Sequence, residues 1–394
     1  MRAEPQALPA GDRLALRWLP LFALAFHLST AHRYGVFRDE LYYVACGRHL
    51  DFGYVDHPPL VALISRVASV LMGTSLLGLR LPAALAGAAT AWVAAQLARE
   101  LGGPANAHRQ AAMCVTLGGN ALFTFQVLSM NAFDHLAWAL CAWLAARALR
   151  TGSERTWLMF GLAAGLGLLN KISVGFLGAG LALGLVLFRR DVLARRGPWL
   201  AAGLAGLLFL PHVLWQVAHD FPTREFIANA RAEKMVDFGP GKFLVLAGLE
   251  GGPGSIPVAL VGLVGLWSLT RWRQHRPLAV AFVAVLALLA STRSKPYYAA
   301  PAFVIVFAAG GATLEALRGR LGRVLRAAAA FLALGLGAMV VPFAKPVLSP
   351  QQYERYAQAL GVTPAAAERH ELGRLPQHFA DMHGWRELAE RVAA

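Results

Sequence analysis

Apolar residues fill most of the chain in blocks that are separated by short polar stretches. A helix needs roughly 17 to 25 such residues to cross a bilayer. Blocks of about this length fall near 14–33, 78–98, 110–128, 132–149, 156–170, 172–188, 198–215, 255–270, 277–292, 297–315 and 324–342. We therefore predict an all-α polytopic membrane protein with about eleven transmembrane helices. The first block has Arg13 and Arg17 at its start and no clear cleavage site, which predicts an uncleaved signal anchor.

One apolar block is too short for this set. The segment "PPLVALISRVASVLMG", residues 58–73, carries Arg66 near its middle, so we expect it to lie along the membrane interface. If it does not cross, every arginine cluster shares the side of the N-terminus, which the positive-inside rule makes cytoplasmic. These clusters are Arg99/Arg109, Arg147/Arg150/Arg155, Arg189/Arg190/Arg195/Arg196, Arg271/Arg273/Arg276 and Arg318/Arg320/Arg323/Arg326.

This topology divides the chain into two parts. Residues 1–342 are expected to form the transmembrane domain, in which 34–77 is a first external loop with interfacial helices and 216–254 is a long external loop. Residues 343–394 then form a short external C-terminal segment. We expect a multi-pass protein of the inner cell membrane, with a cytoplasmic N-terminus and a site that faces the external, periplasmic side.

Composition supports a membrane protein and excludes some partners. Hydrophobic residues make up 57% of the chain and charged residues 15%, with a mean hydropathy of +0.49. The net charge of +15 falls in short clusters between apolar blocks, so it indicates topology and no nucleic-acid partner is expected. Cys46, Cys114 and Cys141 are scattered and predict neither a disulfide framework nor a zinc site. No known metal motif occurs, so we predict no metal.

The first external loop crowds acidic residues into the sequence "VFRDELYYVACGRHLDFGYVDHPPL". Asp39 and Glu40 are adjacent and would point about 100° apart on a helix. We therefore expect one carboxylate to take part in chemistry and the other to support it. An interfacial helix from Asp39 would place Leu41, Val44, Ala45 and, less strictly, Leu50 on one side. The alternative is that both are solvated charges or complement a helix dipole.

Further external candidates flank the apolar blocks. Asp56 and His57 in "DHPP" suit phosphate binding, proton transfer or cation binding, or alternatively helix capping. Asp134 and His135 lie at the outer end of a predicted span, where ionisable groups are costly unless they line a cavity.

Two lysines stand at external span junctions. Lys171 and Lys295 either bind an anion or extend to the interface. The long loop adds a mixed charge set whose length favours a lid over a plain solvated loop. That set is Arg224, Glu225, Arg231, Glu233 and Lys234.

External carboxylates beside external cations, at the mouth of a helical bundle, suit one class of reaction. A carboxylate can deprotonate a hydroxyl acceptor, and a cation can stabilise a departing phosphate. A cleft open to lipid accommodates a long hydrocarbon tail. We predict glycosyl transfer from a lipid phosphate.

The order of several motifs resembles a known family. An apolar anchor is followed by "RDELYY", "GYVDHPPL", "RLPAALAGAATAWVAAQLARELGG", "NAFDHLAWAL", "LLNK" and "KPYYAAPAF". This order is similar to that of the bacterial type C (GT-C) glycosyltransferases related to protein O-mannosyltransferases and lipid A aminoarabinose transferases. The resemblance covers nearly the whole membrane portion.

The resemblance implies a fold, a donor and site residues. The fold is the GT-C bundle, and the donor is a polyprenyl-phosphate-linked sugar used without a nucleotide or a required metal, usually with inversion. Asp39 matches the family's essential acid, with Glu40 beside it, and Asp134 matches a second external acid. We expect Lys171, Lys295 and His57 to contact the phosphate. Asp56, Tyr42 and His135 complete the expected donor-binding set.

Two positions depart from the family members that act on lipid A. Those members have an Arg two positions after the "DE" and a Lys before the "PP", where this chain has Tyr42 and His57. The departure argues against aminoarabinose transfer to lipid A. The acceptor can be a protein, a lipid or a glycan. Two rival functions remain, a secondary transporter and a non-catalytic binding protein of the same fold.

Overall fold

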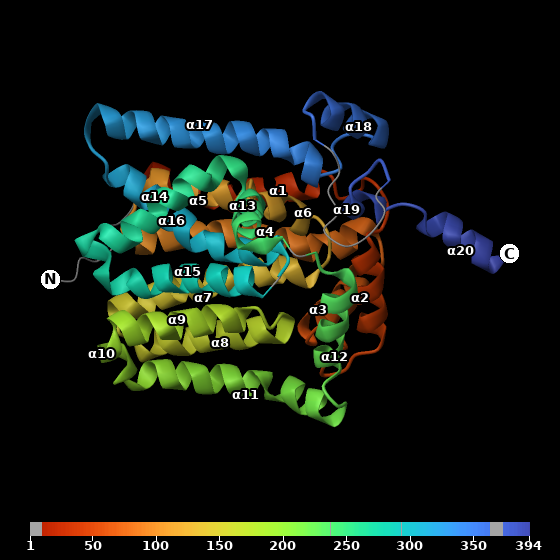
Figure 1. The fold of residues 1–394 in the computed structure, drawn as a ribbon, viewed down its shortest axis with the longest axis horizontal. Helices are drawn as coiled ribbons and strands as arrows, with labels where there is room; N and C mark the ends of the chain where they lie inside the picture. The colour runs from red at the N-terminus through yellow and green to blue at the C-terminus, as the bar shows by residue number, and fades with distance from the viewer. Residues whose placement is uncertain (1–9, 237, 293, 363–372) are drawn as a thin grey trace.

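Helices make up the fold of the computed structural model, which describes residues 10–236, 238–292, 294–362 and 373–394. Most of the helices run side by side in one bundle (Figure 1). They are α1 (Ala10–Leu28), α4 (Leu76–Glu100), α5 (Ala105–Thr116), α7 (Met130–Thr151), α8 (Glu154–Asn170), α9 (Val174–Phe188), α11 (Arg196–Ala218), α14 (Ile256–Ser268), α15 (Arg276–Ser291), α16 (Phe303–Ala316) and α17 (Gly319–Ala344). The predicted all-α membrane bundle is confirmed.

The number of spans differs from the sequence prediction. In the described part of the chain, five helices are long and apolar enough to cross a membrane, or six if one bent pair counts as a single span. Several other bundle helices are short; α9, for example, has 15 residues. At about 1.5 Å per residue, such a helix does not reach across a hydrocarbon core of about 30 Å. The expected count of eleven is therefore not confirmed.

Short helices cross one end of the bundle, here called the α2 end. They are α2 (Arg38–Arg48), α3 (Leu60–Met72) and α12 (Pro222–Asn229), which lie across the long helices in Figure 1. The segment 58–73 thus lies across the bundle and does not follow the long helices, as its length predicted. Val70 and Leu71 of α3 are 65% and 75% exposed, which suits an apolar face against lipid.

Two segments are organised differently from the sequence prediction. The block 110–128 is broken into α5 and α6 (Gly119–Thr124). Part of the expected loop 216–254 forms α13 (Gly239–Gly251), an apolar helix of 13 residues that the span criterion missed because it is short. It turns by 95° into the segment Pro253–Ser268. A Cβ at Gly119 would lie 2.6 Å from the carbonyl oxygen of Leu249, so glycine permits this close approach.

The opposite end of the bundle, here called the α10 end, gathers the arginine clusters. It carries the short helix α10 (Arg190–Leu193), far from α2 in Figure 1. Arginines from separate connections meet there: Arg150 and Arg189 both act on the buried His275, and Arg326 lies 3.7 Å from Glu315. The structure therefore groups at one end clusters that the charge pattern assigned to one side.

The C-terminal segment packs at the α2 end. It contains α18 (Pro350–Ala359), α19 (Gln377–Ala380) and α20 (Trp385–Ala393), of which α20 extends away from the bundle in Figure 1 and has no buried residue. Tyr353, Phe379 and Met382 form a buried apolar cluster with Phe37 and Val127. The C-terminal segment therefore contacts the residue that immediately precedes α2.

Candidate active site

A buried ion pair fixes the start of α2. The Glu40 carboxylate is fully buried and accepts hydrogen bonds from Nε and Nη2 of Arg80, a residue of α4, at 3.0 and 3.1 Å. It also accepts the backbone N–H groups of Phe37 at 2.8 Å and Leu128 at 3.1 Å. All these contacts face the protein interior, so the structure gives Glu40 a supporting position and not a place beside a substrate.

Arg80 is a positioning residue that the sequence prediction missed. Its remaining donors reach the carbonyl oxygens of Ala31 at 2.8 Å, Arg33 at 3.2 Å and Gly35 at 2.7 Å. The side chain therefore joins the end of α1, the loop and α2. Its signal was a lone arginine within an apolar block, which is costly unless fully paired.

Asp39 turns away from this interior and stands at the surface of the α2 end. Its side chain is 34% exposed, and Oδ1 accepts a hydrogen bond from Arg38 Nε at 3.3 Å. Partial burial raises the pKa of Asp39 above its ordinary value, and the Arg38 guanidinium opposes part of that rise. A carboxylate of this kind is a suitable proton acceptor.

A tyrosine-rich group lies beside Asp39. Tyr42 donates a hydrogen bond to Asp56 Oδ1 at 2.5 Å, and Asp56 carries a charge that also acts on Asp39. His57 is buried and stacks on Tyr54 with ring centroids 4.6 Å apart. Burial lowers the pKa of His57, with Asp56 opposing the change. Its ring also lies edge-on to that of Tyr42, with centroids 5.6 Å apart, and its Nε2 is 4.0 Å from Asp56 Oδ1.

The second acidic candidate forms an ion pair with the predicted lysine. Lys171 Nζ, at the junction of α8 and α9, lies 3.5 Å from Asp134 Oδ2 and donates to Asn131 Oδ1 at 2.7 Å. Ser173 also donates to Asp134, and Trp138 donates to Ser173 at 3.2 Å. Asp134 is 1% exposed, so its charge is compensated inside the bundle.

Two tyrosines connect the two acidic groups. Lys171 Nζ lies 4.6 Å from the ring centroid of Tyr298 and 5.9 Å from that of Tyr297. Asp39 is close enough for its charge to act on Tyr297. These tyrosines belong to η4 (Pro296–Ala302), which begins directly after the predicted Lys295. The sequence prediction placed Lys295 in the site and missed both tyrosines, although it used the "KPYY" motif.

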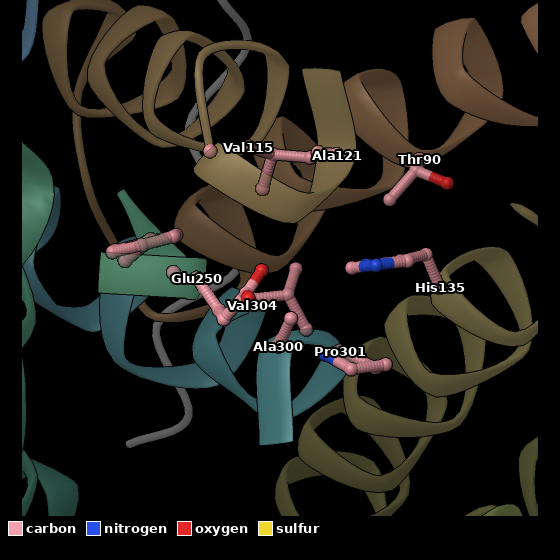
Figure 2. A pocket seen from close by; sticks show the side chains of 11 residues that line it. Thr90, Val115, Ala121, His135, Glu250, Ala300, Pro301 and Val304 are labelled. Carbon is pink, nitrogen blue, oxygen red and sulfur yellow. The ribbon is translucent and has the colours of Figure 1, made fainter. Parts of the chain in front are cut away.

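His135 lies deeper in the bundle. Its Nε2 is 2.9 Å from Asn120 Oδ1, and Figure 2 shows its ring entering a small cavity from the side opposite Glu250. The cavity of about 20 Å³ has room for one water molecule. The structure therefore places His135 in an internal polar network, apart from the surface of the α2 end.

The loop residues expected to form a lid are exposed where the structure describes their side chains. Arg224 and Glu225 are on α12, and Arg231 and Glu233 are on η1 (Ala230–Lys234). The side chain of Lys234 lies outside the described residues. No group of three or more His, Cys, Asp or Glu residues in the described ranges could hold a metal ion.

Comparisons with known proteins agree with this architecture. Residues 56–215 match the family model of dolichyl-phosphate-mannose-protein mannosyltransferases. The chain superimposes on ArnT from Cupriavidus metallidurans, solved with undecaprenyl phosphate, with a TM-score of 0.67 at 16% identity over 90% of this chain and 73% of that one. The chain has the GT-C fold. The GT-C family resemblance predicted from the sequence is confirmed.

Two further matches are weaker or partial. The archaeal oligosaccharyltransferase AglB from Archaeoglobus fulgidus, in complex with an inhibitory peptide and a dolichol-phosphate, gives a TM-score of 0.58 at 11% identity, covering 84% of this GT-C chain and 55% of AglB. Lipid A galacturonosyltransferase RgtD of Rhizobium johnstonii is 31% identical over 189 residues. That match spans 48% of this chain and 40% of the relative.

Proposed function

We propose that the protein is a membrane glycosyltransferase that moves a sugar from a polyprenyl-phosphate-linked donor to a hydroxyl acceptor at the outer face of the inner membrane. The observation that carries this proposal is the α2 end itself. Asp39, a surface carboxylate with a raised pKa, lies close enough for its charge to act on Tyr297, and Lys171 Nζ lies 5.9 Å from the centroid of that ring. The match to the mannosyltransferase family and to a structure solved with undecaprenyl phosphate supports the donor class.

In this mechanism the acceptor hydroxyl loses its proton to the Asp39 carboxylate. The acceptor oxygen bonds to the anomeric carbon from the face opposite the phosphate, so the configuration inverts. The bond between that carbon and the phosphate oxygen breaks, and its electron pair leaves with the polyprenyl phosphate. Lys171 and Lys295 stabilise the charge that grows on this phosphate.

Glu40 and Asp134 act through other groups. Glu40, through Arg80, holds the backbone before and within α2, so that Asp39 keeps its orientation. The Asp134 carboxylate pairs with the Lys171 ammonium, which also lies near the ring of Tyr298, and so helps to hold it in place. Tyr42 binds Asp56, whose charge acts on Asp39. The exposed apolar side chains of α3 lie at the same end, where a lipid-linked donor would arrive.

The test is transfer of radiolabelled sugar from a polyprenyl phosphate by the purified protein in proteoliposomes. We expect Asp39→Asn to lose about 10²- to 10⁴-fold in rate, the range for a general base. The matched control is Asp51→Asn, because Asp51 is an exposed carboxylate of the same loop. It should keep nearly full activity.

The outcomes separate this proposal from its rivals. Equal incorporation by the native protein and Asp39→Asn would remove Asp39 from the mechanism. Absence of incorporation by the native protein, with tight binding of the labelled donor, would indicate a non-catalytic binding protein. Movement of the intact labelled donor across the vesicle membrane, without transfer, would indicate a transporter.

A further inference from the structure

A basic pocket opens at the α10 end, on the opposite side of the bundle from Asp39. Its volume is about 430 Å³, and four arginines line it: Arg150, Arg189, Arg195 and Arg271. They come from α7, from both sides of α10 and from η3 (Thr270–His275). Three separate parts of the chain thus bring guanidinium groups to one cavity.

Positive charge in this pocket exceeds its internal compensation. Arg150 pairs with Glu100, and Arg189 pairs with Asp191 at 2.8 Å. Within the described ranges, neither Arg195 nor Arg271 forms an ion pair with a carboxylate; Arg271 instead lies over the ring of Trp272 at 4.7 Å. The charge of Arg195 acts on Asp191 from beyond ion-pair distance, and Arg271 Nη2 donates to the carbonyl oxygen of Ala312 at 3.5 Å. Both guanidinium groups therefore keep donors for an external anion.

A buried imidazole supplies an independent sign of a ligand. His275 lines the pocket and is 1% exposed, and its Nδ1 has no hydrogen-bond partner among the described residues. Its Nε2 lies 3.2 Å from Gln274 Nε2. A buried polar atom is normally paired, so an unpaired Nδ1 at a cavity wall is consistent with a bound polar group.

The basic pocket adjoins an apolar groove. Trp157 lines both. The groove, of about 290 Å³, runs between α8, α9 and α11, and its lining includes Leu168, Leu181 and Trp199. Trp199 is 65% exposed, and tryptophan favours the membrane–water interface. A ligand with a charged end and an apolar end would fit the two cavities together.

We propose that this pocket and groove bind an anionic phospholipid of the cytoplasmic leaflet, with its phosphate on Arg195 and Arg271 and its acyl chains along α8 and α9. Arginine is suited to phosphate because its planar fork donates two parallel hydrogen bonds. A free phosphate ester also carries a negative phosphate but has no acyl chain to occupy the groove. Because the two cavities share Trp157 in their linings, one ligand with a charged end and an apolar end can reach both, which favours the lipid.

Native mass spectrometry of the delipidated full chain in detergent tests this site. Phosphatidylglycerol should bind, and phosphatidylcholine, which carries no net charge, should bind more weakly. In the double variant Arg195→Gln/Arg271→Gln, affinity for phosphatidylglycerol should fall about fivefold for each arginine. The control Arg320→Gln/Arg323→Gln removes the same charge from exposed positions on α17 and should change little. Equal loss in both double variants would overturn the proposal.

A second pair of variants distinguishes a lipid from a free phosphate ester. Gly178 lines the groove, and a Cβ there would meet nothing within 4 Å, so Gly178→Phe should fold and obstruct the groove. Gly203→Phe is the control, because it is equally open and does not line the groove. We expect weaker phosphatidylglycerol binding only in Gly178→Phe. Unchanged binding in that variant, or displacement of the lipid by equimolar glycerol 3-phosphate, would overturn the lipid assignment.

Discussion

The two ends of this bundle differ in how far their charged side chains are paired with groups of opposite charge. At the α2 end, three of the four acidic candidates have a lysine or arginine partner: Asp39 has Arg38, Glu40 has Arg80 and Asp134 has Lys171. The fourth, Asp56, accepts a hydrogen bond from Tyr42. At the α10 end, arginines outnumber the carboxylates that pair with them. The α2 end resembles a preorganised reaction site, in which the protein supplies both signs. The α10 end has a charge excess, which the membrane itself can compensate.

The buried pair of the α2 end offers the largest stability contrast between the two ends. Arg80→Met leaves the Glu40 carboxylate buried without its cation, and we expect a loss of about 3 to 5 kcal/mol in the free energy of unfolding. Arg195→Met, at the α10 end, leaves no buried carboxylate and should change it by less than about 0.5 kcal/mol. Denaturant unfolding in detergent micelles gives both values. Similar losses in the two variants would contradict the contrast.

Sequence patterns predicted the parts of the α2 end that depend on local geometry. Adjacency alone predicted that Asp39 and Glu40 diverge, and the structure shows one at the surface and the other buried. Lys171 and Asp134 were both assigned to the external ends of predicted spans, and they meet at 3.5 Å. The sequence can assign two helix ends to the same side of a bundle even when it does not show which helices are neighbours.

Partners that depend on helix packing could not be predicted. Arg80 lies inside an apolar block, and only the packing of α4 against the loop shows that it holds Glu40. Lys345 was not considered, yet it is fully buried and donates to the carbonyl oxygen of His27 at 3.2 Å. The helix α13 itself was missed because its 13 residues fall below the length of a span. Each omission concerns a contact between segments far apart in the chain.

The next largest effect concerns the cation of the α2 end. Lys171→Met removes the ammonium that we expect to stabilise the departing phosphate, so sugar transfer should fall about 10²- to 10³-fold, as when one preorganised electrostatic contact is lost. The matched control is Lys242→Met, because Lys242 is an exposed lysine on α13. Initial rates of radiolabelled transfer measure both. A comparable fall for Lys242→Met would show that the effect arises from general charge and not from the α2 end.

The smallest expected effect is on the pH dependence of transfer. Asp39 must be deprotonated to accept a proton, so the rate should fall as the pH drops through the pKa of Asp39, which burial raises. The Arg38 guanidinium lowers that pKa, since it favours the charged carboxylate. Arg38→Gln should therefore move the acid limb of the rate profile to higher pH. Because Arg38 is 45% exposed, solvent screening should keep the displacement below about one pH unit.

The control for this displacement is Arg48→Gln. Arg48 is an exposed arginine in the last turn of the same helix, so its removal changes the net charge equally without removing the partner of Asp39. Its acid limb should stay where the native limb lies. If both variants moved the limb equally, the surface potential would set the protonation of Asp39. The α2 end would then depend on net charge, and the contrast between local pairing at this end and unpaired arginines at the α10 end would fail.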